Sequence, residues 1–285
     1  MRVLVTGAAG MLGRALCENL KGAHTVIGVD IGDFDLTETS CIARIIETQP
    51  EIVCHLAAFT HVDGCEKNPE KAYRSNVVAT RNVAVACREA KCSMLYLSTD
   101  YVFDGQTDRP YSEDDKPSPL NMYGRTKLIG EWFVERIVSQ NYRVRSSWLY
   151  GEGGRNFVDT ILALAEEKDV LEVVDDQTGS PTYTKDLASA LMNLIESKKF
   201  GIYHLTNNGE CSWYDFAVSI CKKAGVEGCA IKRVKTALSA RPANRPAYSV
   251  LDNRIYAQTF GGYLRSWEEA LEEYLEGRSG GGSNG

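Results

Sequence analysis

The sequence predicts an α/β fold in which a doubly wound parallel sheet precedes a smaller, mainly helical C-terminal domain. Through the first 150 residues, short apolar runs alternate with segments of helical periodicity. Two of these runs, at 52–57 and 94–97, are apolar almost throughout, as in the buried central strands of a parallel sheet. After about residue 151 the alternation is lost, and helical stretches are separated by loops rich in Gly and Pro.

The first 150 residues are expected to form one domain of alternating strands and helices. Its strands are expected at 1–6, 25–29, 52–57, 94–98 and 143–148. Its helices are expected near 12–20, 38–48, 69–90 and 122–139. Strands that are joined through helices of this length pair in parallel, with helices on both faces of the sheet.

Residues 151–276 are expected to form the smaller domain. Helices are expected near 156–167, 185–198, 213–224 and 267–276, and a strand near 202–205 is expected to return to the main sheet. Two of these helices begin with a capping-box pattern, Ser212 with Asp215 and Ser266 with Glu269. Residues 277–285 are rich in Gly and Ser and are predicted to form a disordered tail.

Composition and charge argue against several classes of protein. Of the 285 residues, 44% are hydrophobic and 25% are charged, as in an ordinary globular protein. The formal net charge is -6 with no basic stripe, which argues against nucleic acid as a partner. The chain begins in a strand, and no apolar run approaches the length of a membrane span. Nine scattered cysteines without a Cys-x-x-Cys pair are typical of a reducing compartment, so we expect a cytoplasmic protein without a membrane partner.

A glycine-rich turn directly follows the first strand. Gly7, Gly10 and Gly13 are spaced by three residues at the start of the first helix. Glycines at such a turn permit a tight bend and let a pyrophosphate approach the free amides of the helix N-terminus. Asp30 ends the second strand, where an acidic side chain can bind the ribose hydroxyls of a dinucleotide. The two features predict a Rossmann-type dinucleotide-binding unit.

Tyr123 and Lys127 carry the most specific local signal. They are four residues apart on a predicted helix, so both side chains lie on one helix face. A free tyrosine has a pKa of about 10, and a nearby ammonium favours the phenolate and lowers that pKa. An isolated pair of this kind is common by chance. Here it follows a glycine turn and a strand that ends in hydroxyl residues, which favours a proton-transfer role.

Those hydroxyl residues are Ser98 and Thr99, at the end of the fourth expected strand. In open parallel sheets, ligands bind at the carboxyl ends of the strands, so we expect both side chains to point into the crevice. A hydroxyl there can bind a carbonyl oxygen and stabilise the negative charge that develops as hydride arrives. The alternative interpretation is that they form a local turn or helix cap.

Together these motifs resemble the extended short-chain dehydrogenases/reductases, and more narrowly the dTDP-4-dehydrorhamnose reductases. The resemblance covers nearly the whole chain to about residue 276. Its most specific elements are Ser98-Thr-Asp-Tyr-Val-Phe103 and Asp176-Gln-Thr-Gly-Ser-Pro-Thr182. The other matching elements are the glycine motif, Ala57-Ala-Phe-Thr-His-Val-Asp63, Tyr123-x-x-x-Lys127, Arg145-Ser-Ser-Trp-Leu-Tyr-Gly151 and Arg245-Pro-Ala-Tyr-Ser-Val-Leu-Asp252.

The resemblance implies roles for individual residues. Tyr123 would donate a proton to the sugar C4 oxygen as hydride leaves the nicotinamide, Lys127 would hold the nicotinamide ribose and tune Tyr123, and Thr99 would orient the carbonyl. Asn76 matches a structural and catalytic asparagine of these reductases. The implied cofactor-binding residues are Gly7, Gly10, Met11, Leu12, Gly13, Asp30, Ala57, Ala58, Thr60, Tyr123 and Lys127. The implied substrate-binding residues are Val62, Thr99, Tyr101 and Trp148. For Trp148, an ordinary core position is an equally good interpretation.

The resemblance also implies a reaction, namely reduction of the C4 ketone of dTDP-4-dehydro-6-deoxy-L-mannose to dTDP-L-rhamnose with NADPH or NADH. Asp30 disfavours a 2′-phosphate by charge repulsion, but these reductases often accept both coenzymes, so the preference stays open. Some relatives hold a divalent metal at a dimer interface with glutamates. Ala15 stands where we would expect one of them, so no metal is predicted. The resemblance allows a homodimer.

Three alternatives stay open at this point. The first is a reductase of another nucleotide-linked 4-ketosugar, because these motifs do not specify the hydroxyl pattern of the sugar. The second is a non-catalytic, nucleotide-binding regulatory subunit, against which the intact Thr99, Tyr123 and Lys127 argue. The third is a dehydrogenase of unrelated substrate. An epimerase or a dehydratase of the extended family is less favoured. A dehydratase would need an acidic pair beside the catalytic hydroxyl, and only Asp100 follows Thr99.

Overall fold

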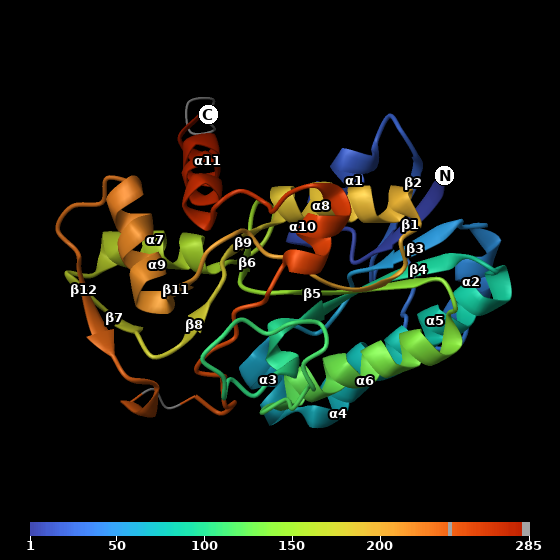
Figure 1. Cartoon of the computed structure of the whole chain (residues 1–285), viewed down its shortest axis with the longest axis horizontal. Coiled ribbons are helices and arrows are strands. Elements are labelled where there is room, and N and C mark those ends of the chain that lie inside the picture. The colour runs from blue at the N-terminus through green and yellow to red at the C-terminus, as the bar shows by residue number, and fades with distance from the viewer. Residues whose placement is uncertain (239–240, 281–285) are drawn as a thin grey trace.

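The computed structural model describes residues 1–238 and 241–280. Within those residues the main sheet has six parallel strands in the order β10-β5-β4-β3-β1-β2 (Figure 1). The strands are β1 (Arg2–Thr6), β2 (Thr25–Val29), β3 (Ile52–His55), β4 (Ser93–Thr99), β5 (Asn141–Ser146) and β10 (Gly201–His204). From β1 the chain adds β2 on one side and then β3 and the later strands on the other side. A switch of this kind creates a crevice at the carboxyl ends of the strands.

Helices cover both faces of this sheet. On the upper face in Figure 1 lie α1 (Met11–Leu20), α8 (Thr184–Ser197) and α10 (Arg254–Phe260). On the lower face lie α2 (Cys41–Glu47), α5 (Ala79–Ala90) and α6 (Met122–Ile137). Leu12, Leu16 and Leu20 of α1 are buried against Leu187 and Leu191 of α8. This packing is the predicted amphipathic pattern of the first helix, and it fixes the end of α1 that follows the glycine turn.

The segment predicted as one helix over 69–90 is divided in the structure. It consists of α4 (Pro69–Tyr73), a π-helical turn at Arg74–Val78 and α5. A π-turn inserts extra backbone into a helix and is frequent at functional sites. Here it brings the buried Asn76 to the loop after β3. A short helix that the sequence did not predict, α3 (Val62–Lys67), follows the same loop, and a 3₁₀ turn at Asp100–Val102 follows β4.

The smaller region lies beside the carboxyl ends of the main strands and has its own core, which contains Tyr150, Phe216, Leu271 and Tyr274. Its helices are α7 (Phe157–Glu167), α9 (Trp213–Lys223) and α11 (Trp267–Gly280). Its short strands are β6 (Leu149–Tyr150), β7 (Val170–Val174), β8 (Thr178–Gly179), β9 (Thr182–Tyr183), β11 (Cys211–Ser212) and β12 (Ala230–Val234), and a 3₁₀ turn spans Thr236–Leu238. Both predicted capping boxes are present, at α9 and at α11.

The chain passes between the two regions more often than the expected boundary at residue 150 implies. Helices α8 and α10 and strand β10 all lie beyond that boundary, yet they pack on or extend the main sheet. The disordered tail expected at 277–285 needs a correction, because α11 continues through Gly280. Its buried residues Leu271 and Tyr274 anchor the helix, and an ion pair joins Arg278 to Asp159. Residues 281–285 lie outside the described residues.

The nine cysteines lie in the described part of the chain, and all are free thiols there. No described helix combines the length and the apolar character that crossing a membrane requires.

Candidate functional site

The glycine-rich turn is built against the loop that follows β3. Gly7 has a φ of +71°, and a Cβ there would lie 2.8 Å from the Ala57 amide nitrogen. A Cβ on Gly13 would lie only 2.1 Å from the Gly7 carbonyl oxygen. Glycine is therefore required at both positions, for the turn and for the close approach of α1. The Asp30 carboxylate accepts a hydrogen bond from the Ala9 amide at 3.0 Å and so ties the end of β2 to this turn.

A cavity of about 1000 Å³ runs along the carboxyl ends of the strands of the main sheet. It extends from Asp30 beyond β2 to Leu97 of β4, two residues before Thr99. The implied cofactor residues that line it are Gly7, Gly10, Met11, Leu12, Gly13, Asp30, Ala57, Ala58 and Thr60. Free amides at the N-terminus of α1 and the Asp30 carboxylate beside the glycine turn match the pyrophosphate and the adenosine ribose of a dinucleotide. Tyr123 and Lys127 are not among the lining residues.

A second cavity, of about 970 Å³, lies between the two regions of the chain. Val62 and Tyr101 line it from the main domain, and Phe157 and Trp213 line it from the smaller one. Basic side chains lie beside these apolar walls: Arg241 and Arg245 both line the cavity, and Arg245 forms an ion pair with Asp63 at 2.9 Å. Aromatic surface next to guanidinium groups can hold the base and the phosphates of a nucleotide.

Trp148 lies next to a residue that lines this cavity. It is absent from the residues that line this cavity. Its ring stacks on Trp213 with centroids 3.5 Å apart, and Trp213 faces the cavity. Its φ is +48°, and a Cβ on Gly179 would lie 2.5 Å from the Trp148 ring. Trp148 therefore packs against the Trp213 ring, which forms part of the cavity wall.

Tyr123 and Lys127 lie on the first turns of α6, close to the end of β4. The side chain of Asn121 caps this helix by accepting a hydrogen bond from the Gly124 amide at 2.9 Å. A Cβ on Gly124 would lie 2.0 Å from the Tyr101 carbonyl oxygen, so the first turn is pressed against the backbone after Thr99. The rings of Tyr101 and Tyr123 meet edge-on with centroids 6.1 Å apart. The Tyr123 ring therefore lies beside Tyr101, which lines the second cavity.

Asn76 connects the coenzyme-side loop to the same helix. Its side-chain oxygen accepts a hydrogen bond from the Phe59 amide at 2.7 Å, and its amide nitrogen donates to the Thr126 hydroxyl at 3.1 Å. The residue is buried. A buried polar group that is satisfied on both sides holds its neighbours in a fixed relation. Asn76 thus fixes the loop after β3 relative to α6.

The pKa values at the site differ from the simple tyrosine–lysine expectation. Burial raises the pKa of Tyr123 well above its usual value, although a hydrogen bond with Thr99 acts in the opposite direction. Burial also lowers the pKa of Lys127 to about 7, although the Glu131 carboxylate acts to raise it. A lysine that is only partly protonated at neutral pH is a weak electrostatic partner. The expectation that the Lys127 charge lowers the pKa of Tyr123 is therefore not met in this structure.

Ser98 requires a correction. Its hydroxyl donates a hydrogen bond to the Glu131 carboxylate at 2.5 Å, and both side chains are buried. Successive residues of a strand face opposite sides of the sheet, so Ser98 and Thr99 cannot both point into the crevice. Sequence reasoning also missed Glu131 and Arg145, which form a buried ion pair. A charged residue inside an apolar strand or helix pattern is the signal that could have found them.

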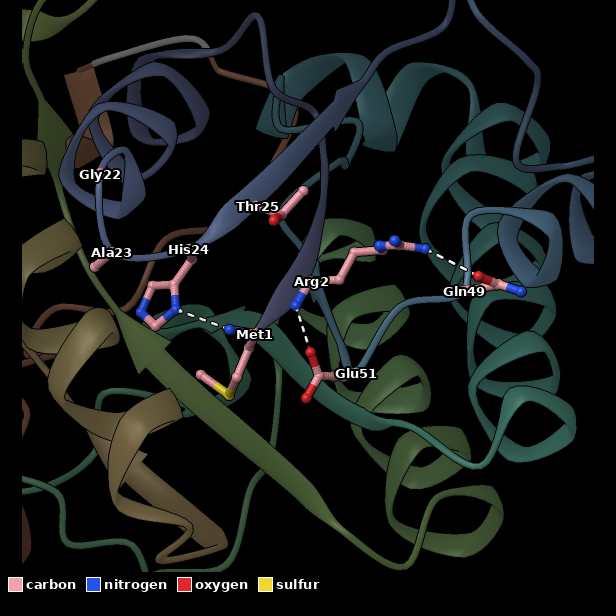
Figure 2. Close-up of a pocket in the computed structure, with 8 residues that line it drawn as sticks. All are labelled: Met1, Arg2, Gly22, Ala23, His24, Thr25, Gln49 and Glu51. Carbon is pink, nitrogen blue, oxygen red and sulfur yellow. Dashed lines mark hydrogen bonds between the residues drawn. The ribbon is translucent and has the colours of Figure 1, made fainter.

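A third cavity, of about 620 Å³, lies at the other end of the sheet, beside Met1 and Arg2. Figure 2 shows that the polar groups here are already bonded to one another. The Arg2 amide donates to Glu51, and the N-terminal amine contacts His24. This cavity faces away from the glycine turn, because the turn follows the carboxyl end of β1. Among the described residues, no group of three or more His, Cys, Asp or Glu side chains is arranged to hold a metal ion.

The family model for the RmlD substrate binding domain matches residues 1–279. The chain is 44% identical over 280 residues to the spore coat polysaccharide biosynthesis protein SpsK of Bacillus subtilis, with 98% of each chain covered. It is 38% identical to a dTDP-4-dehydrorhamnose reductase of Aggregatibacter actinomycetemcomitans, with 95% of this chain and 97% of the relative covered. It is 36% identical to a dTDP-4-keto-6-deoxy-D-glucose reductase of Streptomyces niveus, with 95% and 96% covered.

Solved structures agree with these relatives. A dTDP-4-dehydrorhamnose reductase from Clostridium acetobutylicum superposes with a TM-score of 0.94 at 41% identity, and the match covers 98% of this chain and 100% of that one. A dTDP-4-dehydrorhamnose reductase from Bacillus anthracis, solved in complex with NADP, superposes with a TM-score of 0.93 at 39% identity, with 97% and 99% covered.

Proposed function

The chain belongs to the RmlD substrate binding domain family, and from that premise we propose that it reduces the C4 ketone of dTDP-4-dehydro-6-deoxy-L-mannose to dTDP-L-rhamnose. It is an NAD(P)H-dependent oxidoreductase of the extended short-chain type. The observation that carries the proposed reaction is the position of the Tyr123 phenol. It lies edge-on against Tyr101, which lines the cavity between the two regions.

We assign the larger of the first two cavities to the coenzyme. When bound there, the reduced coenzyme supplies the hydride that adds to the carbonyl carbon. The α1 amides would bind the pyrophosphate, and Asp30 would bind the adenosine ribose. Because the cavity reaches Leu97, two residues before Thr99, its inner end suits the nicotinamide. Lys127, buried on α6, would hold the nicotinamide ribose.

Tyr123 is the proposed proton donor to the ketone oxygen. Its phenol keeps its proton at neutral pH, since desolvation raises its pKa. Transfer of that proton becomes favourable as negative charge develops on the ketone oxygen, and the hydrogen bond with Thr99 stabilises the resulting phenolate. Thr99 and Tyr123 would therefore act as one unit at the reacting oxygen.

We assign the cavity between the two regions to the nucleotide sugar. Phe157 and Trp213 offer apolar surface for a base or a deoxysugar, and Arg241 and Arg245 offer charge for the diphosphate. Val62 and Tyr101 would contact the sugar at the catalytic end. Trp148 would contribute through its stacking on Trp213.

Another 4-ketosugar remains the main rival substrate. The Streptomyces niveus relative is named for a 4-keto-6-deoxy-D-glucose substrate, and its identity to this chain is close to that of the rhamnose-pathway relative. The regulatory-subunit alternative is less favoured, because Thr99, Tyr123 and Lys127 are all present and grouped near the end of β4. A homodimer and a cytoplasmic location are also proposed, and light scattering of the purified protein tests the first.

The proposed function is tested by following the near-ultraviolet absorbance of NADH or NADPH while upstream enzymes generate dTDP-4-dehydro-6-deoxy-L-mannose in place. Rapid loss of absorbance, with dTDP-L-rhamnose as the product, is expected. Tyr123→Phe should reduce turnover by about 10²- to 10⁴-fold while coenzyme binding is retained. Turnover of dTDP-4-keto-6-deoxy-D-glucose alone would favour the rival substrate. Coenzyme binding without turnover of either sugar would favour the regulatory subunit.

A further inference from the structure

Asp100 lies directly behind the catalytic Thr99 and is enclosed. Its side chain is 2% exposed, as is that of Ser249. The Thr99 hydroxyl lies 3.0 Å from one carboxylate oxygen of Asp100 and is placed to donate to it. The Ser249 hydroxyl donates to the other oxygen at 2.6 Å. Among the described ion pairs, none involves Asp100.

The Thr99 hydroxyl has one hydrogen and two acceptors that compete for it. An ionised Asp100 accepts only, so it takes the Thr99 hydrogen. Tyr123 also needs that hydrogen, because a hydrogen bond from Thr99 favours its phenolate. A protonated Asp100 can instead donate to the Thr99 oxygen, whose other lone pair accepts the Tyr101 amide at 3.2 Å. The Thr99 hydrogen is then released toward Tyr123 and the ketone oxygen.

We propose that Asp100 is a positioning residue that works in its protonated form and directs the Thr99 hydrogen toward Tyr123 and the substrate. This inference rests on the proposed function, because it concerns the donor that completes ketone reduction. No net proton leaves Asp100 in the step. The proton delivered to the ketone oxygen comes from Tyr123, and the hydride comes from the reduced coenzyme.

The surroundings of Asp100 support a protonated carboxyl near neutral pH. Burial raises the pKa of Asp100 to about 7, although hydrogen bonds from Ser249, Thr99 and the backbone amides of Asp100 and Tyr101 all act in the opposite direction. The titratable groups that interact with Asp100 are Tyr101 on the same turn and Tyr123 on α6, and Arg241 and Arg245 act in turn on Tyr101. Lys127, one turn further along α6, also titrates near pH 7, so an experiment must separate it from Asp100.

Asp100→Asn separates the two groups. Asparagine can donate its amide hydrogen to Thr99 and accept from Ser249, so it copies the protonated carboxyl and cannot ionise. In wild type, log kcat/KM, which reports the free enzyme, should fall above about pH 7 with a slope of about -2, from Asp100 and Lys127 together. In Asp100→Asn the slope should be about -1. Ser249→Ala removes a hydrogen bond that favours the carboxylate, so the Asp100 component should move to higher pH.

Infrared spectra of the enzyme without substrate provide a second measurement. Wild type should show a protonated-carboxyl band that disappears as the pH rises through about 7, and Asp100→Asn should lack this band. The inference is overturned if the band is absent from wild type, or if Asp100→Asn keeps the wild-type slope. A loss of kcat of more than about 100-fold at acidic pH in Asp100→Asn would also overturn it, because the carboxylate itself would then be needed. If the band is present but wild type turns over no ketosugar, the proposed function fails instead.

Discussion

The Arg145 guanidinium donates two hydrogen bonds to the Glu131 carboxylate, at 2.8 and 3.0 Å, and both side chains are 3% exposed or less. Glu131 lies one helical turn after Lys127 on α6, and its carboxylate also accepts the Ser98 hydroxyl. The pair therefore joins strands β4 and β5 to the helix that carries Tyr123. A buried pair of this kind costs desolvation energy, but removing one partner leaves a buried charge without compensation.

Glu131→Leu should destabilise the fold by about 3 to 5 kcal/mol, because Arg145 would remain buried and unpaired. The double variant Glu131→Leu/Arg145→Met should lose less stability than Glu131→Leu, since neither buried charge remains. Urea denaturation of the two variants and wild type measures the difference. Equal losses in the single and double variants would show that packing, not the charge, determines the effect.

Lys127 predicts a pH dependence of stability. Its pKa in the folded protein is lowered to about 7 by burial, whereas the unfolded chain has the ordinary value near 10.5. Between pH 7 and pH 10.5 the unfolded state binds a proton that the folded state does not, so the free energy of unfolding rises with pH in this range. The destabilisation caused by burying Lys127 is therefore largest below about pH 7. Lys127→Met should therefore raise the unfolding free energy most at about pH 6 to 7 and hardly at all above about pH 10. Denaturation at several pH values checks the sign, and an effect independent of pH would contradict it.

The position of Asp30 predicts a preference between NADH and NADPH. Its carboxylate lines the coenzyme cavity, and it would repel the 2′-phosphate of NADPH. Asp30→Ala should raise the ratio of kcat/KM for NADPH over NADH by about tenfold, which corresponds to about 1.4 kcal/mol. Affinity for both coenzymes should fall, because the bond to the Ala9 amide is also lost.

Asp33→Ala is the matched control for that ratio. Asp33 lies in the same turn and accepts the Asp30 amide, but it does not line the cavity. Its removal should leave the coenzyme ratio close to that of wild type. If both variants change the ratio equally, the net charge of the turn is responsible rather than contact with the ribose.

Local patterns were sufficient for the parts of the site that depend on neighbours in sequence. The glycine turn, Asp30 at the end of the next strand and the Tyr123–Lys127 pair each follow from short spacings along the sequence. The direction of Ser98 did not, because the face that a strand residue takes depends on how the whole strand sits in the sheet. Asp100 and Ser249 are 149 residues apart in sequence, and only the folded chain brings them together. The π-turn at Arg74–Val78 likewise depends on the tertiary bonds of Asn76.

Gly124 tests how tightly α6 must approach the catalytic turn. A Cβ at this position would lie 2.0 Å from the Tyr101 carbonyl oxygen and 2.8 Å from its carbonyl carbon, and backbone atoms cannot move aside as a side chain can. Gly124→Ala should therefore push the first turn of α6 away from β4 and separate Tyr123 from Thr99. Because a displacement of this size disrupts alignment at the reacting atoms, kcat should fall by about 100-fold.

Gly277→Ala is the control for the glycine-to-alanine change itself. Gly277 lies in α11, and a Cβ there would meet nothing within 4 Å. Alanine is the better helix former by about 1 kcal/mol, so this variant should be slightly more stable, with kcat close to that of wild type. Steady-state kinetics and thermal unfolding of both variants separate the two effects. If Gly124→Ala retained wild-type kcat, close contact between α6 and Tyr101 would not be needed for the reaction, and the proposed coupling of Tyr123 to Thr99 would have to be abandoned.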